Sequence, residues 1–338
     1  LLGGFIVDQM SWHWIFFINI PVGLLAMAGI WIFLKETPRK STQTLDVLGS
    51  IWLSVALLAL MFGFQVLGDA HINWLSLIIS LGISGLSFWV FIRQEGRVAN
   101  PIIPLKLFKI RTFVTQNLVA ALISGFLMGF EVYLPTWTQG LLGLPASLAG
   151  FAITPSSLMW IVGSFIAGKL LLNRSPKQII NFSLTFILVG GIAMALAPQS
   201  TPFWCFFVIA AICGTGFGIT ITTTTVTVQN QVPKEDVGVA TSLNTLARTL
   251  GQTLMISVFG IILNVQMANG VASHKGTDLA MMNRLINPQT AKSLGKSLLK
   301  PLRQILYGGL HWIFIVALGL IILSYLINHM DRNQNPET

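Results

Sequence analysis

Two ionisable side chains lie inside long apolar runs, where charge is costly and therefore informative. Glu131 lies near one end of the run 113–134, and Arg248 lies about ten residues into the run 238–263. A carboxylate at membrane depth can bind and release protons, and an arginine there must face water or hydrogen-bond acceptors because it stays charged. The sequence therefore makes Glu131 a candidate proton-binding residue, and Arg248 a candidate for a residue that faces a water-filled cavity or pairs with acceptors.

Each of the two residues also has a structural interpretation. Glu131 precedes Tyr133 and Trp137, which are typical of anchors at the membrane interface, so it could be an acid that reaches interfacial water. Arg248 could tie helices together through backbone carbonyls. At ~1.5 Å per residue the two lie at depths on the order of 10 Å apart. We therefore expect no direct salt bridge, but action at two levels of one aqueous path.

A threonine-rich stretch at the end of another apolar run is the third polar feature. It reads "TITTTTVTVQNQ" and covers residues 220–231. Threonine hydroxyls can bond back to carbonyls of their own helix, or they can line a polar vestibule. The sequence leaves both interpretations open. Gln229 and Asn230 can also cap the end of the helix.

Signatures of soluble enzymes are absent from the sequence. It contains no H-E-x-x-H, no G-x-S-x-G, no P-loop and no paired C-x-x-C motif. Cys205 and Cys213 lie roughly 12 Å apart along a helix, which is too far for a disulfide. The five histidines are scattered along the chain. We therefore expect neither enzymatic activity nor a metal or cofactor.

The composition predicts the broad class of the chain. It is 54% hydrophobic and 9% charged over 338 residues, whereas soluble domains carry roughly 25% charged residues. Such a chain cannot cover its apolar surface in water, so we expect an all-α polytopic membrane protein that contacts the lipid bilayer. The net charge of +9 comes from short loops rather than from one basic patch, which argues against nucleic-acid binding.

Nine apolar runs are long enough to cross a membrane, for which ~20 residues are needed. They cover residues 14–34, 47–67, 74–92, 113–134, 147–171, 179–197, 203–225, 238–263 and 306–327. Residues 1–7 resemble the last turns of a tenth span, so we expect that helix to begin before this sequence. The basic, proline-containing stretch 93–111 would separate two helical bundles.

The distribution of lysine and arginine predicts the topology. One set of alternate loops carries twelve of these residues, and the short loops of the other set carry none. The twelve are Lys35, Arg39, Lys40, Arg93, Arg97, Lys106, Lys109, Arg111, Lys169, Arg174, Lys177 and Lys234. Because positive charge marks the cytoplasmic side, we expect residues 8–13 outside and the tail 329–338 in the cytoplasm.

The long loop 264–305 is an exception, because it is predicted to be external and yet carries six lysines and arginines. Long loops translocate largely regardless of charge, so the short loops decide. Within "AKSLGKSLLKPLRQIL", Leu294, Leu298, Leu302 and Ile305 share one helical face and three lysines follow another. This pattern predicts a basic amphipathic helix on the outer surface of the membrane.

Glycines at helical spacing indicate close packing between helices. Gly125 and Gly129 are four residues apart, as are Gly214 and Gly218 in "GTGFG". Small residues at this spacing let another helix approach closely within a membrane. We therefore assign these four glycines to helix packing.

The stretch "LGGFIVDQMSWHWIFFINIPVG" closely resembles the antiporter motif at the fifth helix of 14-span major facilitator drug:proton antiporters of the EmrB/QacA type. The pattern in that family is G-P-x-L-G-G, then a short outer turn, then W-R-W-x-F-x-I-N-x-P-x-G. The matching residues are Leu2, Gly3, Gly4, Trp12, Trp14, Phe16, Ile18, Asn19, Pro21 and Gly23. His13 replaces the usual arginine, and the expected G-P falls before Leu1.

A second stretch, "GTGFG" followed by "VQNQVPKEDVGVATSLNTLARTLGQ", resembles the second-half signature of the same family, which ends in R-x-x-G-G. Arg248 and Gly251 match it, and Gln252 departs from the second glycine. "NPIIPLKLF", "YLPTWTQGLLGLPASLAG" and "LHWIF" also fall where the family has similar phrases. The resemblance thus covers the whole chain, and it adds Gly251 to the helix-packing residues.

The resemblance implies a role for each site residue. Gly3 and Gly4 would control bending of helix 5 at the interface between two bundles. Glu131 would be a proton or cation site, and Arg248 a cavity residue that tunes it. These roles belong to alternating access between two bundles around a midplane cavity.

On the major facilitator fold, the chain would carry nine complete transmembrane helices and the end of a tenth. Residues 1–34 would form the end of helix 5 and helix 6, and residues 35–112 two extra linker helices with a cytoplasmic loop. Residues 113–328 would form the C-terminal six-helix bundle. The implied function is export of lipophilic or cationic drugs, hence drug resistance, in exchange for protons across a bacterial cytoplasmic membrane. It requires an N-terminal bundle that residues 1–338 lack; an accessory periplasmic adaptor is a further candidate partner.

Two other functions fit the same residues. The fold would equally suit an exporter of a lipid, a siderophore or a metabolite. Half a transporter cannot form an alternating-access cavity by itself, so a non-transporting membrane binder or sensor, or an inactive truncated product, is the third hypothesis.

Overall fold

The long apolar runs fold as helices, because a helix satisfies all of its backbone hydrogen bonds within one segment, as a membrane requires. The computed structural model describes residues 6, 13–33, 46–68, 72–98, 101–274, 276–286, 288–291 and 293–331. Within these residues all regular structure is helical, and eight helices are long and apolar enough to cross a membrane. The prediction of an all-helical polytopic membrane protein is therefore confirmed.

The long helices account for most of the described residues. They are α4 (Val47–Gly68), α5 (Trp74–Glu95), α6 (Arg111–Gly140), α7 (Ala146–Leu170), α8 (Pro176–Ala195), α9 (Phe203–Asn230), α10 (Val237–Ser273) and α13 (Lys296–Met330). The shorter elements are α2 (His13–Phe17), α3 (Asn19–Phe33), η1 (Leu105–Lys109), η2 (Lys234–Asp236), α11 (Leu279–Ile286) and α12 (Pro288–Ala291).

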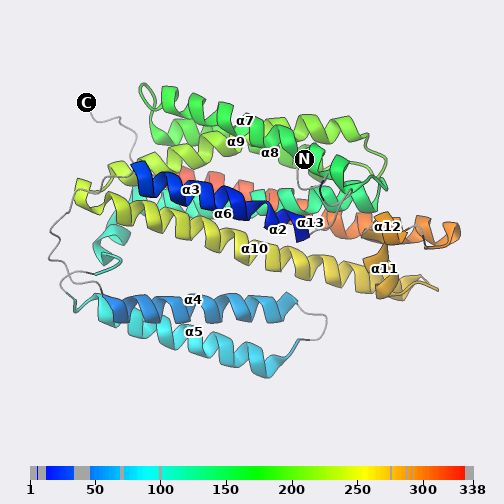
Figure 1. The fold of residues 1–338 in the computed structure, drawn as a ribbon, viewed down its shortest axis with the longest axis horizontal. Coiled ribbons are helices and arrows are strands. Elements are labelled where there is room, and N and C mark those ends of the chain that lie inside the picture. The colour runs from blue at the N-terminus through cyan, green and yellow to red at the C-terminus, as the bar shows by residue number, and fades with distance from the viewer. Residues whose placement is uncertain are drawn as a thin grey trace.

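Six of these helices, α6 to α10 and α13, pack side by side along one long axis (Figure 1). α7 packs on α9, α6 on α10, and α13 on both α6 and α8. Aromatic side chains fill the core between them. The ring of Trp137 is fully buried and lies within about 6 Å of the rings of Phe206, Tyr307 and Phe314. Aromatic core contacts thus join α6, α9 and α13.

One end of this body, which we call the basic end, collects the starts of α6, α8 and α10 and the end of α13. The Lys177 ammonium donates to the backbone oxygen of Asp331 at 2.7 Å, which joins α8 to the end of α13. The Thr112 hydroxyl donates to Oδ1 of Asp331 at 3.0 Å, which joins α6 to the same point. A salt bridge of 3.2 Å between Lys106 and Asp236 joins η1 to η2. These contacts fix which helix ends lie together.

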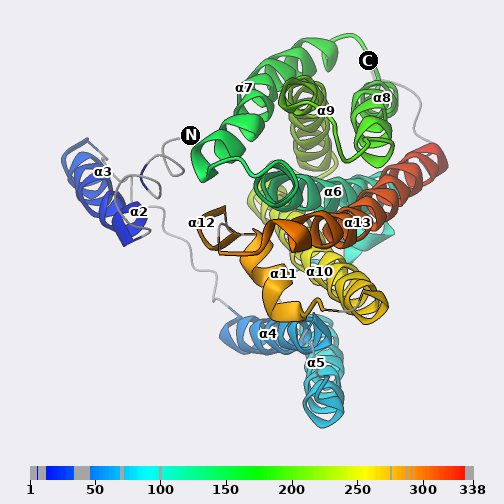
Figure 2. The same cartoon turned by 90° about the vertical axis from the view of Figure 1, so that its right-hand side faces the viewer.

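α4 and α5 form a separate antiparallel pair beside the six-helix body (Figures 1 and 2). The Ser84 hydroxyl of α5 donates to the carbonyl of Ala56 in α4 at 2.9 Å. The pair contacts the body through α10, where the Asn264 amide donates to the carbonyl of Gly68 at 2.9 Å. In Figure 2 α2 and α3 lie to one side of the bundle, and none of the residues of α3 is buried.

The first predicted span differs from the structure. Residues 14–34 are described through Phe33 as two helices, α2 and α3, with a turn at Ile18 between them. α3 has 15 residues, which is short for a span of ~20 residues. The count of nine spans therefore stays a prediction, and the end of a tenth helix lies outside the described residues apart from Ile6.

The predicted amphipathic helix on the outer membrane surface is wrong. α10 continues to Ser273 and α13 already begins at Lys296, so the basic stretch forms the first turns of a long helix. Leu302 is fully buried, and Leu294 and Ile305 are buried as well. Their apolar face packs in the protein core rather than on lipid, because α6 and α10 extend far enough to cover it.

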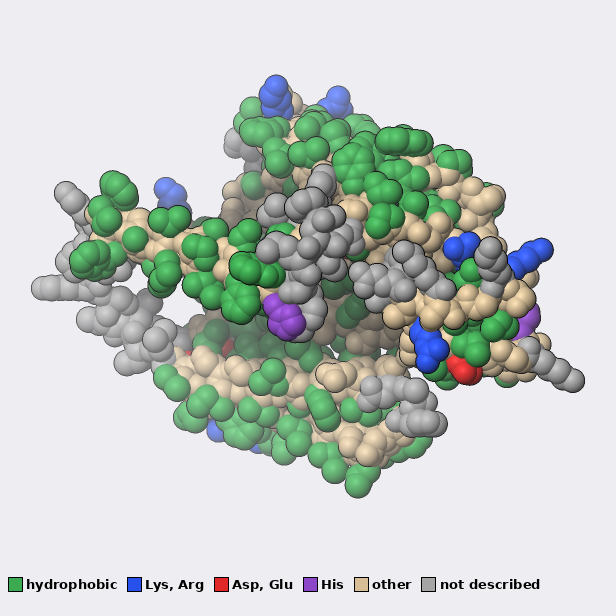
Figure 3. Space-filling model, turned by 45° about the vertical axis from the view of Figure 1, so that its right-hand side comes forward, with side chains coloured by type: hydrophobic (Ala, Val, Ile, Leu, Met, Phe, Trp, Pro, Cys, Tyr) green, Lys and Arg blue, Asp and Glu red, His purple; other side chains and the backbone are tan. Residues whose placement is uncertain are grey.

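The outer surface carries many large apolar side chains, as expected of a protein in contact with lipid. Figure 3 shows hydrophobic side chains on many parts of the visible face, interspersed with other side chains and backbone, and lysine and arginine side chains mainly towards its margins. Helices α4, α5, α7, α8 and α13 carry many exposed large apolar residues. Among the described residues, the central stretches of α6, α9 and α10 carry none.

Candidate functional site

Small residues on α6 let α10 approach closely. A Cβ atom added to Gly125 would lie 2.6 Å from Cγ of Met255, and one added to Gly129 would lie 2.5 Å from Cε2 of Phe259. In both cases the contacting residue is 130 positions further along the chain. Because residue numbers rise in the same direction along both helices, α6 and α10 are parallel.

Gly251 extends the same stripe on the α10 side. A Cβ there would meet the backbone of Ala121, so the two helix backbones are in direct contact, again with an offset of 130. This offset places Glu131 level with residue 261, which is 13 residues beyond Arg248. The depth gap is therefore roughly 20 Å at ~1.5 Å per residue, twice the gap expected from the sequence. The glycine contacts, rather than aligned helix starts, set the register.

Glu131 lies in the interior of α6, with its side chain exposed. It lies roughly 8 Å from the middle of this 30-residue helix, at ~1.5 Å per residue. If the helix is centred on the bilayer, Glu131 lies within the hydrocarbon core of ~30 Å. The prediction that Tyr133 and Trp137 anchor the interface here is wrong, because both are buried in the protein core. Helix α6 continues nine residues beyond Glu131, so the acid does not lie at the helix end.

Polar groups accompany Glu131 along one side of α6. Asn117, Ser124 and Glu131 follow one another at intervals of seven residues, which places them on the same helical face. The Ser124 hydroxyl is buried and has no hydrogen-bond partner among the described residues. Pro135, four residues beyond Glu131, has no N–H group, so the carbonyl of Glu131 lacks its usual helical donor. This face, named here the α6 polar stripe, therefore offers several free polar atoms.

The inner end of the α6 polar stripe meets a hydrogen-bonded amide network. The Asn244 amide of α10 donates to Oδ1 of Asn117 at 3.1 Å, and the Thr225 hydroxyl of α9 donates to Oδ1 of Asn244 at 3.1 Å. Asn244 is fully buried. The Gln229 amide of α9 donates to the Thr241 hydroxyl of α10 at 2.9 Å. Asn117 and Asn244 were not predicted as site residues, although amides within apolar runs give the same kind of signal as Glu131.

Arg248 lies one turn beyond this network, half-buried on α10. Its Nη2 atom donates to the Thr245 hydroxyl on the same helix at 3.2 Å. Its Nε atom is buried and makes no hydrogen bond within the described part of the chain. Nor does any described carboxylate lie within 4.0 Å of the guanidinium. The guanidinium thus keeps donors available for water, for a ligand or for another part of a larger assembly.

Removing the Asn244 side chain is expected to lower the free energy of unfolding, because Asn117 and Thr225 both lose a buried partner. Hydrogen bonds between membrane helices average about 0.6 kcal/mol and reach about 1.7 kcal/mol in mutant cycles. A double-mutant cycle of Asn117→Ala and Asn244→Ala should give a coupling energy in that range. Additive effects of the two variants would show that their hydrogen bond contributes nothing.

The threonine-rich stretch is mostly buried inside the body rather than lining an open vestibule. Thr220, Thr223, Thr224 and Thr227 are buried on α9. The Thr224 hydroxyl donates to the carbonyl of Ile221 on its own helix at 3.1 Å. Backbone bonding, one of the two interpretations left open by the sequence, therefore occurs here, while Thr225 and Gln229 of the same stretch add hydrogen bonds to α10.

Close packing also joins α9 to α7. A Cβ added to Gly214 would meet the backbone of Ser156, and one added to Gly218 would meet the backbone of Trp160. The partner side of this contact contains Gly163, where a Cβ would meet the backbone of Thr215. Gly163 was not predicted from the sequence as a packing residue, because it has no glycine four residues away in the chain.

The residues of the antiporter motif are described in part. Gly3, Gly4 and Trp12 lie outside the described residues. The ring of Trp14 packs edge-on against Phe17 at 6.0 Å and is half exposed. The remaining motif residues in α3 are Asn19, Pro21 and Gly23. A Cβ at Gly23 would meet nothing within 4 Å, so this glycine does not face another helix in the structure.

Two buried carboxylates near the start of α4 and the end of α5 did not figure in the sequence analysis. Oδ1 of Asp46 accepts the backbone N–H of Gly49 at 2.9 Å, as an N-cap does. Oε1 of Glu95 accepts the backbone N–H of Ile103 at 3.1 Å. These bonds position the start of α4 and the loop after α5. The sequence could have predicted this N-cap, because an aspartate directly before an apolar run is typical of the start of a helix.

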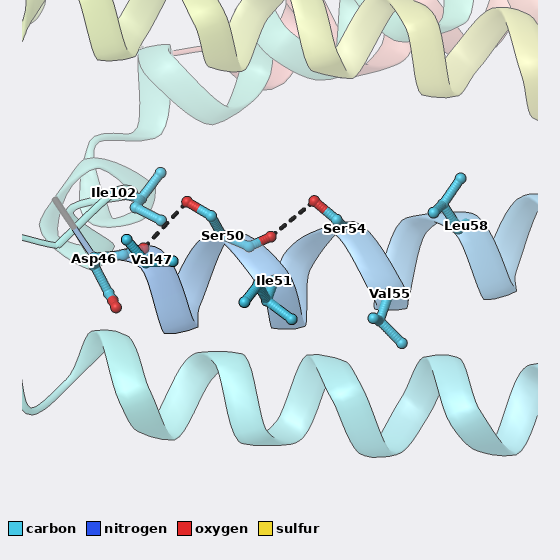
Figure 4. Close-up of a pocket in the computed structure, with 8 residues that line it drawn as sticks. All are labelled: Asp46, Val47, Ser50, Ile51, Ser54, Val55, Leu58 and Ile102. Carbon is cyan, nitrogen blue, oxygen red and sulfur yellow. Dashed lines mark hydrogen bonds between the residues drawn. The ribbon is translucent and has the colours of Figure 1, made fainter.

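A shallow pocket of about 350 Å³ follows the side of α4 towards α10 (Figure 4). Figure 4 shows Ser50, Ser54 and Leu58 on this side, while Ile51 and Val55 point towards α5. The hydroxyl of Ser50 donates to the carbonyl of Asp46, and that of Ser54 to the carbonyl of Ser50. Both hydroxyls donate within α4, so neither hydroxyl proton is available to a ligand in this pocket.

The comparisons with known proteins agree on one family. The model of the Major Facilitator Superfamily matches residues 1–256. "Multidrug resistance protein 3" of Bacillus subtilis (strain 168) is 28% identical, over 96% of this chain and 66% of that protein. "Multidrug efflux pump SdrM" of Staphylococcus aureus (strain N315) is 30% identical, over 79% of this chain and 58% of that protein. The chain therefore spans about three fifths to two thirds of the length of these two curated relatives.

A solved structure has the same fold. A bacterial homologue of the human lysosomal transporter Spinster, crystallised in an inward-facing and occupied conformation, matches with a TM-score of 0.51. The match covers 83% of this chain and 66% of that chain at 15% identity, so it concerns the fold alone. Since the family model also covers most of the sequence, this chain belongs to the Major Facilitator Superfamily.

Proposed function

We propose that this chain is the C-terminal part of a proton-coupled drug exporter of the 14-span antiporter type. The observation that carries the proposal is the exposed carboxylate of Glu131 in the interior of α6. A charged side chain in lipid costs on the order of 2.5–3.5 kcal/mol on insertion scales, so Glu131 should face water or a second bundle. The missing bundle would come from helices outside residues 1–338.

A single exposed carboxylate is suited to the exchange of a proton for a cationic drug. An ionised Glu131 can bind a cationic drug, and a protonated Glu131 cannot, so the proton and the drug exclude one another. The α6 polar stripe runs from Glu131 to the Asn117 amide, which lies roughly 20 Å away along the helix. Alternating exposure of this stripe to the two sides of the membrane would then exchange protons for drug.

The names of the relatives support the class of cargo. Two of the curated proteins reported above are named for multidrug resistance or multidrug efflux. The distribution of lysine and arginine supports an orientation with the basic end in the cytoplasm. We therefore place the exporter in a bacterial cytoplasmic membrane, with its C-terminal tail inside the cell.

Ethidium accumulation in cells that lack other exporters tests this function, because ethidium is a lipophilic cation. Cells that express the complete transporter should accumulate less ethidium than control cells, and a protonophore should abolish the difference. Unchanged accumulation of ethidium and of other lipophilic drugs would contradict the proposal. Dependence of a secreted lipid, siderophore or metabolite on the same protein would then assign the cargo to that class instead.

Replacing Arg248 with Gln is expected to slow ethidium efflux without shifting the pH at which efflux is half-maximal. Arg248 lies roughly 20 Å from Glu131 in depth, about two screening lengths at physiological ionic strength, so it hardly tunes the acid directly. In this proposal the charge of Arg248 acts on drug at the depth of Arg248 in the cavity, and not on the protonation of Glu131. Arg174→Gln, which removes an exposed charge at the basic end, is the matched control. A shifted pH profile in Arg248→Gln would contradict this separation into two levels.

A further inference from the structure

A second pocket lies at the basic end, between η1, α6 and α13. It has a volume of about 390 Å³ and is lined by Phe108, Lys109, Arg111, Val114, Thr115, Leu118, Ile327 and Met330. Its apolar members Phe108, Leu118 and Met330 are about half exposed. It therefore opens on the outer surface of the bundle, away from the α6 polar stripe.

The pocket is arranged with charge at one end and apolar side chains along its length. Arg111, Val114 and Leu118 share one face of α6 at intervals of three and four residues. Leu118 lies roughly 10 Å deeper along the helix than Arg111, at ~1.5 Å per residue. Ile327 and Met330 form the opposite wall from α13. A ligand that fits this shape has a polar end at Arg111 and an extended apolar tail.

The two cations at the mouth of the pocket are Lys109 and Arg111. Within the described residues, neither of them lies within 4.0 Å of an acidic oxygen. Lys106, one turn away, is by contrast paired with Asp236 at 3.2 Å. Asp331, at the end of α13, accepts a hydrogen bond from Thr112 at 3.0 Å. The positive charge of Lys109 and Arg111 therefore remains available to an anionic ligand.

We propose that this pocket binds one anionic phospholipid. The lipid phosphate accepts hydrogen bonds from Lys109 and Arg111, and one acyl chain lies along Val114, Leu118 and Ile327. Lysine and arginine at the head-group level attract anionic lipid, and a guanidinium suits the phosphate geometry. The chemistry requires only that the chain spans the membrane, so it does not depend on the proposed transport.

Native mass spectrometry of the purified chain with phosphatidylglycerol tests this proposal, with phosphatidylethanolamine as the reference lipid. Each cation contributes about fivefold to lipid affinity, so Lys109→Gln and Arg111→Gln should each weaken phosphatidylglycerol binding about fivefold, and the double variant about 30-fold. The double variant Lys169→Gln with Arg174→Gln removes the same charge from the end of α7 and the turn that follows it. It should bind phosphatidylglycerol as the wild type does.

Two further arms distinguish a lipid from a free anion. Leu118→Trp keeps both cations and fills the apolar part of the pocket, so it should also weaken phosphatidylglycerol binding. Soluble glycerol phosphate should bind much more weakly than the intact lipid. Equal binding of glycerol phosphate and lipid, equal losses in the Lys169 and Arg174 control, or no preference over phosphatidylethanolamine would each overturn the proposal. Thermal unfolding of every variant checks that a loss of binding is not a loss of fold.

Discussion

Replacing Glu131 with Gln is expected to abolish proton-driven efflux of a cationic drug and, with it, downhill exchange of that drug across the membrane. The glutamine side chain cannot release a proton, so the variant stays in the neutral form that, in the proposed mechanism, belongs to the proton-loaded carrier. Its amide keeps the size of the side chain, and α6 should therefore fold as before. Uphill ethidium efflux should fall to the level of vesicles that lack the transporter.

The controls for this variant separate coupling from folding and from surface charge. Glu235→Gln removes an exposed carboxylate from η2 at the basic end and should leave efflux unchanged. Glu131→Asp retains an ionisable group and should retain part of the coupled efflux. Coupled efflux at the wild-type rate in Glu131→Gln would remove this residue from the mechanism, whatever the result for Glu131→Asp.

Replacing Gly251 with Ala is expected to lower the free energy of unfolding by about 1–3 kcal/mol, the usual range for an overpacked core. The new Cβ would meet the carbonyl oxygen, carbonyl carbon and Cα of Ala121. These are backbone atoms, which cannot rotate away as a side chain could, so α6 and α10 would have to separate. Reversible unfolding in mixed detergent micelles measures the change.

A matched glycine on the same helix gives the control for this prediction. Gly260 also lies in α10, but a Cβ there would meet nothing within 4 Å. Gly260→Ala should therefore raise the free energy of unfolding, by up to about 1 kcal/mol, because alanine favours the helix. Equal effects of the two variants would show that the contact with Ala121 does not limit how closely the helices pack.

The sequence was sufficient to locate most of the helices, because apolar runs of span length have few alternatives in a membrane. It was not sufficient to decide which side of each helix faces protein. Lipid and protein core are about equally apolar, so hydropathy alone does not distinguish them. Trp137 and Leu302 illustrate the limit: both were predicted to lie at the membrane surface, and both are fully buried in the core.

The relative depth of Glu131 and Arg248 also could not be predicted from the sequence. Counting from the predicted span ends gives Glu131 and Arg248 a separation about half of that in the structure. Three contacts between small residues and their partners fix the true register of α6 and α10. By contrast, Asn117 and Asn244 could have been found from the sequence, since an amide within an apolar run needs a partner as much as a charge does.

Drug-dependent proton movement tests proton-coupled export most directly. Everted membrane vesicles with the complete transporter are acidified inside by respiration, and ethidium is then added to the medium. If drug and proton exchange at Glu131, ethidium should enter the vesicles and protons should leave, so the lumen becomes less acidic, and Glu131→Gln should show neither change. Uphill uptake of ethidium without proton release, equal in the wild type and in Glu131→Gln, would contradict proton-coupled export.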